Sequence, residues 1–309
     1  MHQTTIRTSI ECTGIGLHSG KTVRLGLRPA AENTGILFHV RTPEGVYDLA
    51  PTPHTVIATG LATTLGSADG KASVATVEHI LAAIRALDID NIHIDTESEI
   101  PIMDGSAASF IMLLNDAGLR RQDATRKMVR VTKPLTFGRD GKSIQVRPYS
   151  GFFVDCTIDF AHPLIGVQHK AMEITPDSFA SIARARTFGF LRDVEMMRTH
   201  GLGLGGSLDN AVVLDECGVV NQDGLRFADE FVRHKILDFV GDMAMLGHPL
   251  QGHFTIHCSG HALNNEFLRA LADNASIYLE AVSFAPEAEK APRVGKVLGK
   301  IPALQPEAA

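Results

Sequence analysis

Apolar residues recur along this chain at the spacings of short β-strands and amphipathic helices. Residues 20–29 and 141–149 alternate between apolar and polar side chains, which predicts a half-buried strand in each segment. A helix with Thr76 as its expected N-cap follows the first strand, and its apolar face consists of Val77, Ile80, Leu81, Ile84 and Leu87. The pattern therefore predicts a fold that contains both strands and helices.

The order of elements in the first half of the chain returns in the second half. After the first helix we expect a strand at 91–95, a turn at 101–105, and a helix that Ser106 could cap, continuing through Phe110, Leu113 and Leu114. The second half is expected to contain a helix at about 227–246, a strand at about 253–257 and a helix at about 264–273. A chain of 309 residues is long for one core, so we predict two domains that meet at about 125–133.

One helix of the second half carries side chains that suit a metal ion. His234, Asp238 and Asp242 are four residues apart and lie on one stripe of that helix. A His and an Asp at this spacing can also form a solvated salt link. However, Glu78 and His79 of the earlier helix offer a further ligand with a carboxylate beside it. Such nitrogen and oxygen ligands suit zinc, which activates water for hydrolysis. The sequence therefore predicts a catalytic zinc site.

Composition and charge exclude several classes of protein. Hydrophobic residues make up 44% and charged residues 21% of the chain, as in an ordinary globular protein. The net charge of −6, the pI of about 6.1 and the lack of a basic cluster argue against a nucleic-acid partner. No apolar run approaches the ~20 residues of a membrane span, and the N-terminus lacks the apolar core of a signal peptide. We expect a cytoplasmic protein with free thiols at Cys12, Cys156, Cys217 and Cys258.

Two segments lie outside the repeated order of elements. Residues 188–213 contain the run G-L-G-L-G-G-S, which no G-K-[S/T] follows, so its glycines are expected to permit tight turns rather than to bind phosphate. Residues 286–309 are rich in Pro, Ala, Glu and Lys and lack aromatic anchors, so we expect a loosely ordered tail.

Eight short blocks of the sequence, taken in order, resemble one enzyme family. They are T-G-I-G-L-H-S-G-K at 13–21, T-V-E-H at 76–79, D-N-I-H-I at 90–94, I-P-I-M-D-G-S-A at 100–107, R-A-R-T-F-G-F at 184–190, L-G-G-S at 204–207, D-G-L-R-F-A-D-E-F-V-R-H-K at 223–235 and S-G-H-A-L-N-N at 259–265. With these blocks the sequence closely resembles the zinc-dependent UDP-3-O-acyl-N-acetylglucosamine deacetylases of lipid A biosynthesis. The ordered set covers the chain from about residue 5 to about residue 285.

The resemblance implies a fold and an activity. The fold would be α+β, with two similar α/β domains at 1–126 and 127–285, each a sheet packed on two helices, and the active site between them. The activity would be hydrolysis of the N-acetyl group of UDP-3-O-(3-hydroxyacyl)-N-acetylglucosamine, which releases acetate in the committed step of lipid A biosynthesis. The insert at 188–213 would form a hydrophobic passage for the acyl chain, and the expected substrate contacts include Leu17, Leu202, Leu204 and Leu208.

The resemblance also assigns roles to single residues. It makes His79, His234 and Asp238 the zinc ligands and Glu78 the general base. The T-V-E-H block alone would indicate only a first-turn Glu that the helix dipole favours. The resemblance makes His261 the general acid, oriented by Asp242. Thr187 would stabilise the oxyanion, and Lys235 would bind either the oxyanion or the phosphates. Phe188 would stack on the sugar.

Two alternative functions remain open at this stage. The chain could be a zinc deacetylase of another N-acetyl sugar, or a non-catalytic nucleotide-sugar binder that kept the fold. The presence of Glu78 and His261 beside three ligands argues against the binder, because binding alone needs no general acid. We expect a small-molecule substrate and a monomer. The histidines without an i+4 partner are expected to be surface or hydrogen-bonded residues, namely His93, His162, His169, His253 and His257.

Overall fold

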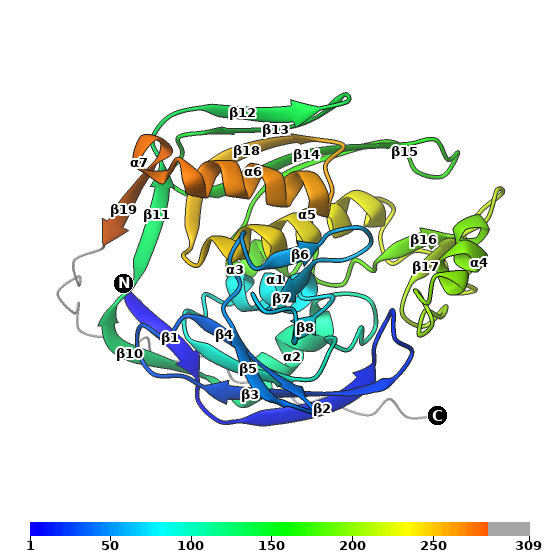
Figure 1. Cartoon of the computed structure of the whole chain (residues 1–309). Coiled ribbons are helices and arrows are strands. Elements are labelled where there is room, and N and C mark those ends of the chain that lie inside the picture. Colours follow the sequence, from blue (N-terminus) through cyan, green and yellow to red (C-terminus); the bar gives the residue numbers. More distant parts are fainter. Residues whose placement is uncertain (284–309) are drawn as a thin grey trace, which may run out of the picture.

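Two β-sheets form the outer layers of the structure, and helices fill the space between them (Figure 1). The structure is a computed structural model, and residues 1–283 are described. The tail expected at 286–309 lies outside the described residues. Within residues 1–283, the mixed α/β architecture agrees with the fold class expected from the sequence.

The first sheet is built from the N-terminal part of the chain. Its five strands have the order β2 (Ile10–Ile15), β3 (Thr22–Pro29), β9 (Ile92–Thr96), β4 (Ile36–Thr42) and β5 (Gly45–Leu49). Neighbouring strands are antiparallel except for β9 and β4, which run parallel. The alternation expected at 20–29 is therefore the strand β3, whose apolar residues face the core.

The second sheet repeats this arrangement in the C-terminal part of the chain. Its strands follow the order β12 (Leu135–Arg139), β13 (Lys142–Arg147), β18 (Leu250–His257), β14 (Phe152–Phe160) and β15 (Gly166–Glu173). Again all neighbours are antiparallel except one pair, β18 and β14. The start of β18 also pairs with β11 (Lys127–Val131), which pairs with β19 (Leu279–Ser283). The two sheets thus share one strand order and one pattern of strand directions.

Four helices pack between the sheets. The first sheet is covered by α1 (Glu78–Ala86) and α2 (Ala108–Ala117), and the second by α5 (Glu230–Met243) and α6 (His261–Asp273) (Figure 1). On the second sheet, Phe239, Phe254 and Phe267 join α5, β18 and α6 through ring centroids 5.4 and 6.2 Å apart. Aromatic contacts at this range add to the free energy gained by burial.

Helices α1 and α5 approach each other closely at the centre of the molecule. A Cβ atom at Gly241 would lie 2.0 Å from the carbonyl oxygen of Glu78. Only glycine allows this approach, because any side chain would force the helices apart. The contact brings the start of α1 beside the C-terminal half of α5, and the residues predicted to bind zinc lie in these two helices.

Shorter elements complete the described residues. The strands β1 (His2–Ile6) and β10 (Leu119–Thr125) pair with each other, and a small sheet contains β6 (Val56–Ala58), β7 (Thr64–Gly66) and β8 (Ser73–Val74). The short helices are α3 (Pro176–Phe179), α7 (Ala275–Tyr278) and the 3₁₀ turn η1 (Ala244–Leu246), which continues α5.

The insert expected at 188–213 forms a separate lobe to the right in Figure 1. It contains β16 (Phe188–Phe190), α4 (Leu191–Thr199) and β17 (Val212–Leu214), with β16 and β17 parallel. Gly201 and Gly203 have φ angles of +71° and +65°. These angles confirm that glycines of the G-L-G-L-G-G-S run permit tight turns, since side chains disfavour positive φ.

Three expected helix starts need correction. The N-cap of α1 is Val77, because Thr76 has a φ of +61° and its hydroxyl donates to Glu99 instead of capping the helix. The N-cap of α2 is Ala107, although the Ser106 hydroxyl does accept from the Ala108 N–H. The last long helix begins at residue 261 rather than 264, so His261 lies in its first turn.

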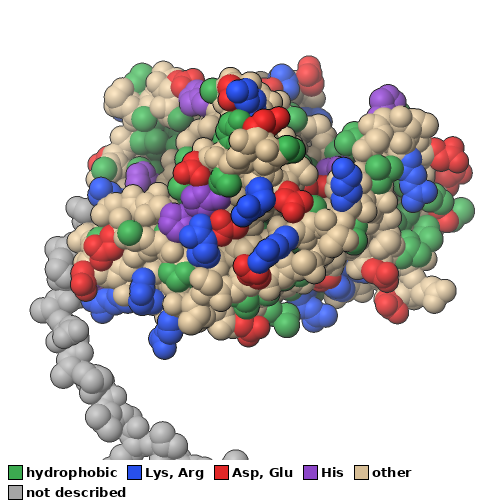
Figure 2. Space-filling view, turned by 60° about the horizontal axis from the view of Figure 1, so that its bottom comes forward, with side chains coloured by type: hydrophobic (Ala, Val, Ile, Leu, Met, Phe, Trp, Pro, Cys, Tyr) green, Lys and Arg blue, Asp and Glu red, His purple; other side chains and the backbone are tan. Residues whose placement is uncertain are grey.

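The charge distribution on the surface does not indicate a class of partner. On the face seen in Figure 2, Lys and Arg side chains are interspersed with Asp and Glu rather than gathered in a stripe of one sign. No helix in residues 1–283 has both the length and the apolar character needed to cross a membrane. All four cysteines are free, as expected from their spacing.

Candidate metal centre and active site

Three buried side chains from α1 and α5 converge on one point. One ligand atom from each of His79, His234 and Asp238 lies within 4.8 Å of the others, and each residue is at most 3% exposed. Asp238 Oδ1 lies 3.2 Å from His234 Nε2 and 3.6 Å from His79 Nε2. A tetrahedral zinc with ligand bonds of 2.0–2.1 Å separates neighbouring ligand atoms by about 3.3 Å. The spacing of these three residues therefore fits a metal ion.

The hydrogen bonds around this cluster leave its inner atoms free. Within the described residues Asp238 Oδ1 is buried without a hydrogen-bond partner, whereas Oδ2 accepts from Lys235 Nζ at 2.8 Å. His234 Nδ1 donates to the Ala185 carbonyl at 3.0 Å, which leaves the Nε2 lone pair pointing inward. A buried carboxylate oxygen without a donor is costly unless a cation binds it. The three residues thus have the donor atoms of a metal site, and the buried Asp238 Oδ1 lacks the partner that a metal ion would provide.

The protonation states of the cluster also suit a metal. Burial lowers the pKa of His234 to about 3, so the ring is neutral and can bind through Nε2. Burial acts against ionisation of Asp238, but the charge that His234 carries at low pH and the ammonium of Lys235 outweigh it, and they hold the pKa of this carboxyl well below its ordinary value. A neutral imidazole and a charged carboxylate are the forms in which these residues bind zinc.

A second carboxylate lies beside the cluster. Glu78 is 3% exposed, and its Oε2 accepts from the main-chain N–H of Thr63 at 3.1 Å. Its Oε1 lies 3.7 Å from His261 Nε2. Burial raises the pKa of Glu78 above its ordinary value. A carboxyl whose pKa is raised toward neutrality is suited to accept and release a proton.

His261 faces Glu78 and is held from behind by Asp242. Its Nδ1 donates to Asp242 Oδ2 at 2.9 Å, and the same carboxylate accepts from Thr63 Oγ1 at 2.8 Å and Asn264 Nδ2 at 2.7 Å. Burial alone would lower the pKa of His261, but the carboxylates of Asp242 and Glu78 raise it to about 10. The imidazole is therefore cationic at neutral pH and can donate a proton.

These groups open into a large cavity. Its volume is about 1010 Å³, and its lining includes Glu78, the three residues of the cluster and His261. Four further residues expected at the site also line it, namely Leu17, Thr187, Phe188 and Lys235. Asp242 lies behind His261 and does not reach the cavity. The arrangement combines a metal cluster, a carboxylate and a cationic histidine in one accessible space.

Two of the three leucines expected in the acyl passage do not line this cavity. Leu208 does, but Leu202 and Leu204 are absent from the lining. Leu204 packs beside Gly20, because a Cβ added at Gly20 would lie 3.0 Å from the Cβ of Leu204. The side chain of Leu204 is 49% exposed. The insert contributes other apolar residues to the wall, namely Phe190, Val194, Met197, Ala211 and Val213.

Comparison with known proteins identifies the family. The family model described as UDP-3-O-acyl N-acetylglycosamine deacetylase matches residues 3–273. The chain belongs to this family. A UDP-3-O-acyl-N-acetylglucosamine deacetylase of Nitratidesulfovibrio vulgaris is 65% identical over 293 residues, 94% of each chain. Proteins of the same name from Oleidesulfovibrio alaskensis and Lawsonia intracellularis are 62% identical over 292 residues and 53% identical over 280 residues. These alignments cover 94% and 90% of this chain, and 95% and 91% of the relatives.

The sequence did not reveal some residues of this deacetylase-family site, namely those that hold Glu78 and Asp242 by hydrogen bonds. Thr63 bonds both Glu78 and Asp242, and Asn264 bonds Asp242. Asn264 stands in the block S-G-H-A-L-N-N and lies one turn after His261, a spacing that could have revealed it. Thr63 follows no periodic pattern, and its role depends on a contact across 179 residues. Lys142 also lines the cavity, at the turn that joins β12 and β13.

Most of the other histidines have hydrogen-bond partners away from the site. His93 contacts His39, His162 contacts the Asp215 carbonyl, His169 contacts Asp155, and His253 contacts Arg147. In residues 1–283 no second group of His, Cys, Asp and Glu side chains meets the geometry of a metal site. These contacts agree with the expectation of surface or hydrogen-bonded histidines, and His257, the fifth of them, is exposed.

Proposed function

We propose that the protein is a zinc-dependent deacetylase that removes the N-acetyl group of UDP-3-O-(3-hydroxyacyl)-N-acetylglucosamine. Water adds to the amide carbonyl, the C–N bond breaks, and acetate and a free amine are released. The observation that carries this proposal is the meeting of His79, His234 and Asp238 with Glu78 and His261 at one cavity of a family member. The activity belongs to the biosynthesis of lipid A, where it is the committed step.

We also propose that the chain consists of two similar domains, at 1–126 and 127–285, with the active site between them. The identical strand order and strand directions of the two five-stranded arrangements support this division. The cavity takes Glu78 and His79 from the first range and His234, Asp238 and His261 from the second. A site shared in this way depends on the packing of α1 against α5.

The first chemical step depends on the metal cluster and Glu78. A zinc ion held by His79, His234 and Asp238 would supply the Lewis acidity that activates water and polarises the amide carbonyl. Glu78 takes the proton of the attacking water, and its raised pKa supports this role. The Thr63 N–H holds one carboxylate oxygen of Glu78, which leaves the other directed toward His261 and the cavity.

The second step requires a proton for the leaving amine. His261 donates it from Nε2, while Nδ1 stays bonded to Asp242. Asp242 never needs to accept a proton, because Thr63 and Asn264 also stabilise its charge. The negative charge that develops on the carbonyl oxygen is stabilised by Thr187 and Lys235, and both line the cavity.

The substrate's other groups are assigned by the chemistry of the cavity wall. Phe188 offers an aromatic ring to the sugar, and the apolar wall of the insert encloses the acyl chain. We assign Lys142 to the phosphates, because Lys235 is bonded to Asp238 beside the metal cluster and serves the oxyanion. The substrate we propose is thus a small-molecule nucleotide sugar. The four free cysteines support a location in the reducing cytoplasm. The monomeric state stays a prediction.

A substrate panel tests this proposal. The zinc-loaded protein should release acetate from the 3-O-acylated substrate, and shortening the acyl chain by four methylenes should lower kcat/KM by up to about 200-fold. The reason is that each buried methylene contributes ~0.8 kcal/mol at most. The readout is the rate of acetate release, measured with one substrate of the panel at a time. Equal kcat/KM values with UDP-N-acetylglucosamine that lacks the acyl chain would favour a deacetylase of another N-acetyl sugar.

A pair of variants locates the acyl passage in the same assay. Ala211→Leu should narrow the wall and lower kcat/KM for the long-chain substrate far more than for the short one, because Ala211 lines the cavity. Leu204→Trp is the matched control, since Leu204 belongs to the same insert but lies outside the lining. Equal losses for both chain lengths in Ala211→Leu would place the passage elsewhere.

A further inference from the structure

The ring of His234 is oriented by a main-chain carbonyl group. His234 Nδ1 lies 3.0 Å from the oxygen of Ala185, and a carbonyl oxygen can only accept a hydrogen bond. The proton of the neutral ring is therefore on Nδ1, and the lone pair of Nε2 faces Asp238 Oδ1, 3.2 Å away. A shift of the Ala185 carbonyl would turn the ring or allow the proton to move from Nδ1 to Nε2.

Ala185 lies in a segment, 183–187, that has no regular secondary structure. Its position consequently depends on contacts with other parts of the chain. The ends of the segment bond to the loop before α2, where Ala183 O accepts from Ala107 N at 3.0 Å and Thr187 N donates to Gly105 O at 2.8 Å. The middle of the segment is held from the other side, by the start of α5.

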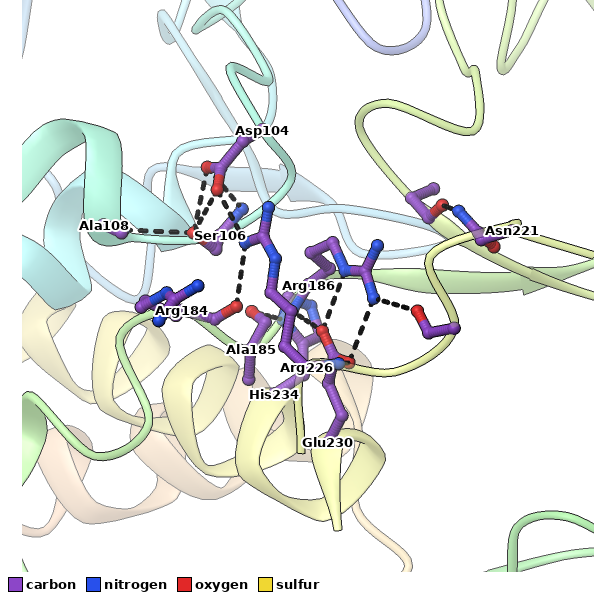
Figure 3. Close-up of polar contacts among 12 residues, drawn as sticks. Asp104, Ser106, Ala108, Arg184, Ala185, Arg186, Asn221, Arg226, Glu230 and His234 are labelled. Atoms are coloured by element: carbon purple, nitrogen blue, oxygen red, sulfur yellow. Dashed lines mark hydrogen bonds and ion pairs between the residues drawn. The ribbon is translucent and has the colours of Figure 1, made fainter. Parts of the chain in front are cut away.

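Glu230 at the start of α5 holds the middle of this segment (Figure 3). Its fully buried carboxylate accepts from the Arg186 main-chain N–H at 2.9 Å and from the Arg186 guanidinium at 2.9 and 3.2 Å. It also accepts from the main-chain N–H of Arg226 at 2.6 Å. Burial acts to raise the pKa of Glu230, but these bonds outweigh it and lower the pKa, so the carboxylate is charged.

The pair of Arg186 and Glu230 lies next to the pair of Ala185 and His234. Arg186 directly follows Ala185, and Glu230 precedes His234 by one helical turn on the same helix face. The two contacts thus lie next to each other and both join the segment 183–187 to α5 (Figure 3). A displacement of Arg186 would move the Ala185 carbonyl with it.

Arg226 extends this network to the first half of the chain. Its Nη1 donates to Asp104 Oδ2 at 2.7 Å and to the Arg184 carbonyl at 3.0 Å (Figure 3). The Ser106 hydroxyl donates to the same Asp104 carboxylate at 2.9 and 3.0 Å. The carbonyl that orients His234 is therefore fixed relative to both α5 and the loop before α2.

We propose that Arg186 and Glu230 are positioning residues that hold the Ala185 carbonyl and thereby fix the tautomer and the ring orientation of His234. This inference rests on the proposed function, because the benefit of a fixed ring is tighter binding of the metal. Neither residue touches the metal cluster, and neither lines the cavity. The direct hydrogen-bond partners of metal ligands usually contribute 10–100-fold to metal affinity, and here that partner is the Ala185 carbonyl, which Arg186 and Glu230 hold in place.

The test measures zinc affinity and the His234 tautomer in Glu230→Gln, on the full-length protein. Chelator competition should show a dissociation constant for zinc 10–100-fold higher than in the wild type. Nitrogen-15 spectra of histidine-labelled, metal-free protein should show that His234 no longer carries its proton solely on Nδ1. A variant with lower stability but the same native contacts around His234 would not change this spectroscopic signature.

Two further variants make the result decisive. Asp229→Asn is the matched control, because this neighbouring carboxylate bonds Arg233 and Lys170 but not the segment 183–187. It should keep the zinc affinity within about twofold, below the range of outer-shell effects. Arg186→Lys keeps a cation but lacks the fork of donors, and it should weaken zinc binding in the same direction. It decides the matter if Glu230→Gln does not fold.

Unchanged zinc affinity, or an unchanged His234 tautomer, in the folded variant would overturn the positioning role. A wild type that binds no zinc would instead refute the proposed function, so the two failures are distinguishable.

Discussion

Replacing Glu78 with Gln should lower kcat by about 10²–10⁴-fold, the usual contribution of a general base. The amide has nearly the shape of the carboxylate but cannot accept the proton of the attacking water. Glu78 is buried beside the metal cluster without belonging to it, so the variant should keep its zinc. The measurement is the steady-state rate of acetate release at saturating substrate, with the zinc content of the same preparation as its control. A variant with full zinc and undiminished kcat would remove Glu78 from the reaction.

His261→Ala should cause a loss of similar size and should also change the pH dependence. The cationic imidazole is the form that donates a proton, and it is present below the pKa of His261 and lost above it. The neighbouring carboxylates raise this pKa to about 10 in the metal-free protein, and the charge of a bound cation would lower it again. The rate of the wild type should therefore fall on the alkaline side of its pH profile, and the fall should vanish in His261→Ala.

Asp242→Asn provides the companion variant for this prediction. Asp242 raises the pKa of His261, so its replacement by a neutral amide should move the alkaline fall to lower pH while His261 remains in place. The readout is kcat/KM across the pH range. An alkaline limb that survives unchanged in His261→Ala would assign the general acid to another group.

The sequence predicted the metal cluster because its signal is local. His234 and Asp238 are one helical turn apart, and the block T-V-E-H places His79 next to a carboxylate. Helix periodicity also located α1 and α5, and the alternation of apolar and polar residues located β3 and β13, to within a few residues. These features depend on spacing along the chain, which the sequence displays directly.

The errors concern features that depend on contacts between distant segments. The cap of α1 was misplaced because the positive φ of Thr76 turns its side chain toward Glu99, 23 residues away. Leu202 and Leu204 were expected in the acyl passage and do not line the cavity, because composition cannot say which face of a loop meets it; the place of the passage itself stays a prediction. Thr63 escaped detection for the same reason, since its bond to Asp242 joins α5 to an irregular segment.

The measurement that tests the central claim most directly is the zinc content per chain, determined together with acetate release, for the wild type, His79→Ala and His234→Ala. The account predicts one zinc per chain and active deacetylation in the wild type. In both variants it predicts a strong loss of zinc together with a loss of activity that follows the lost metal. Because excess zinc could occupy Glu78 and His261, the metal is to be removed and restored at one equivalent. Full zinc content in both variants would contradict the account.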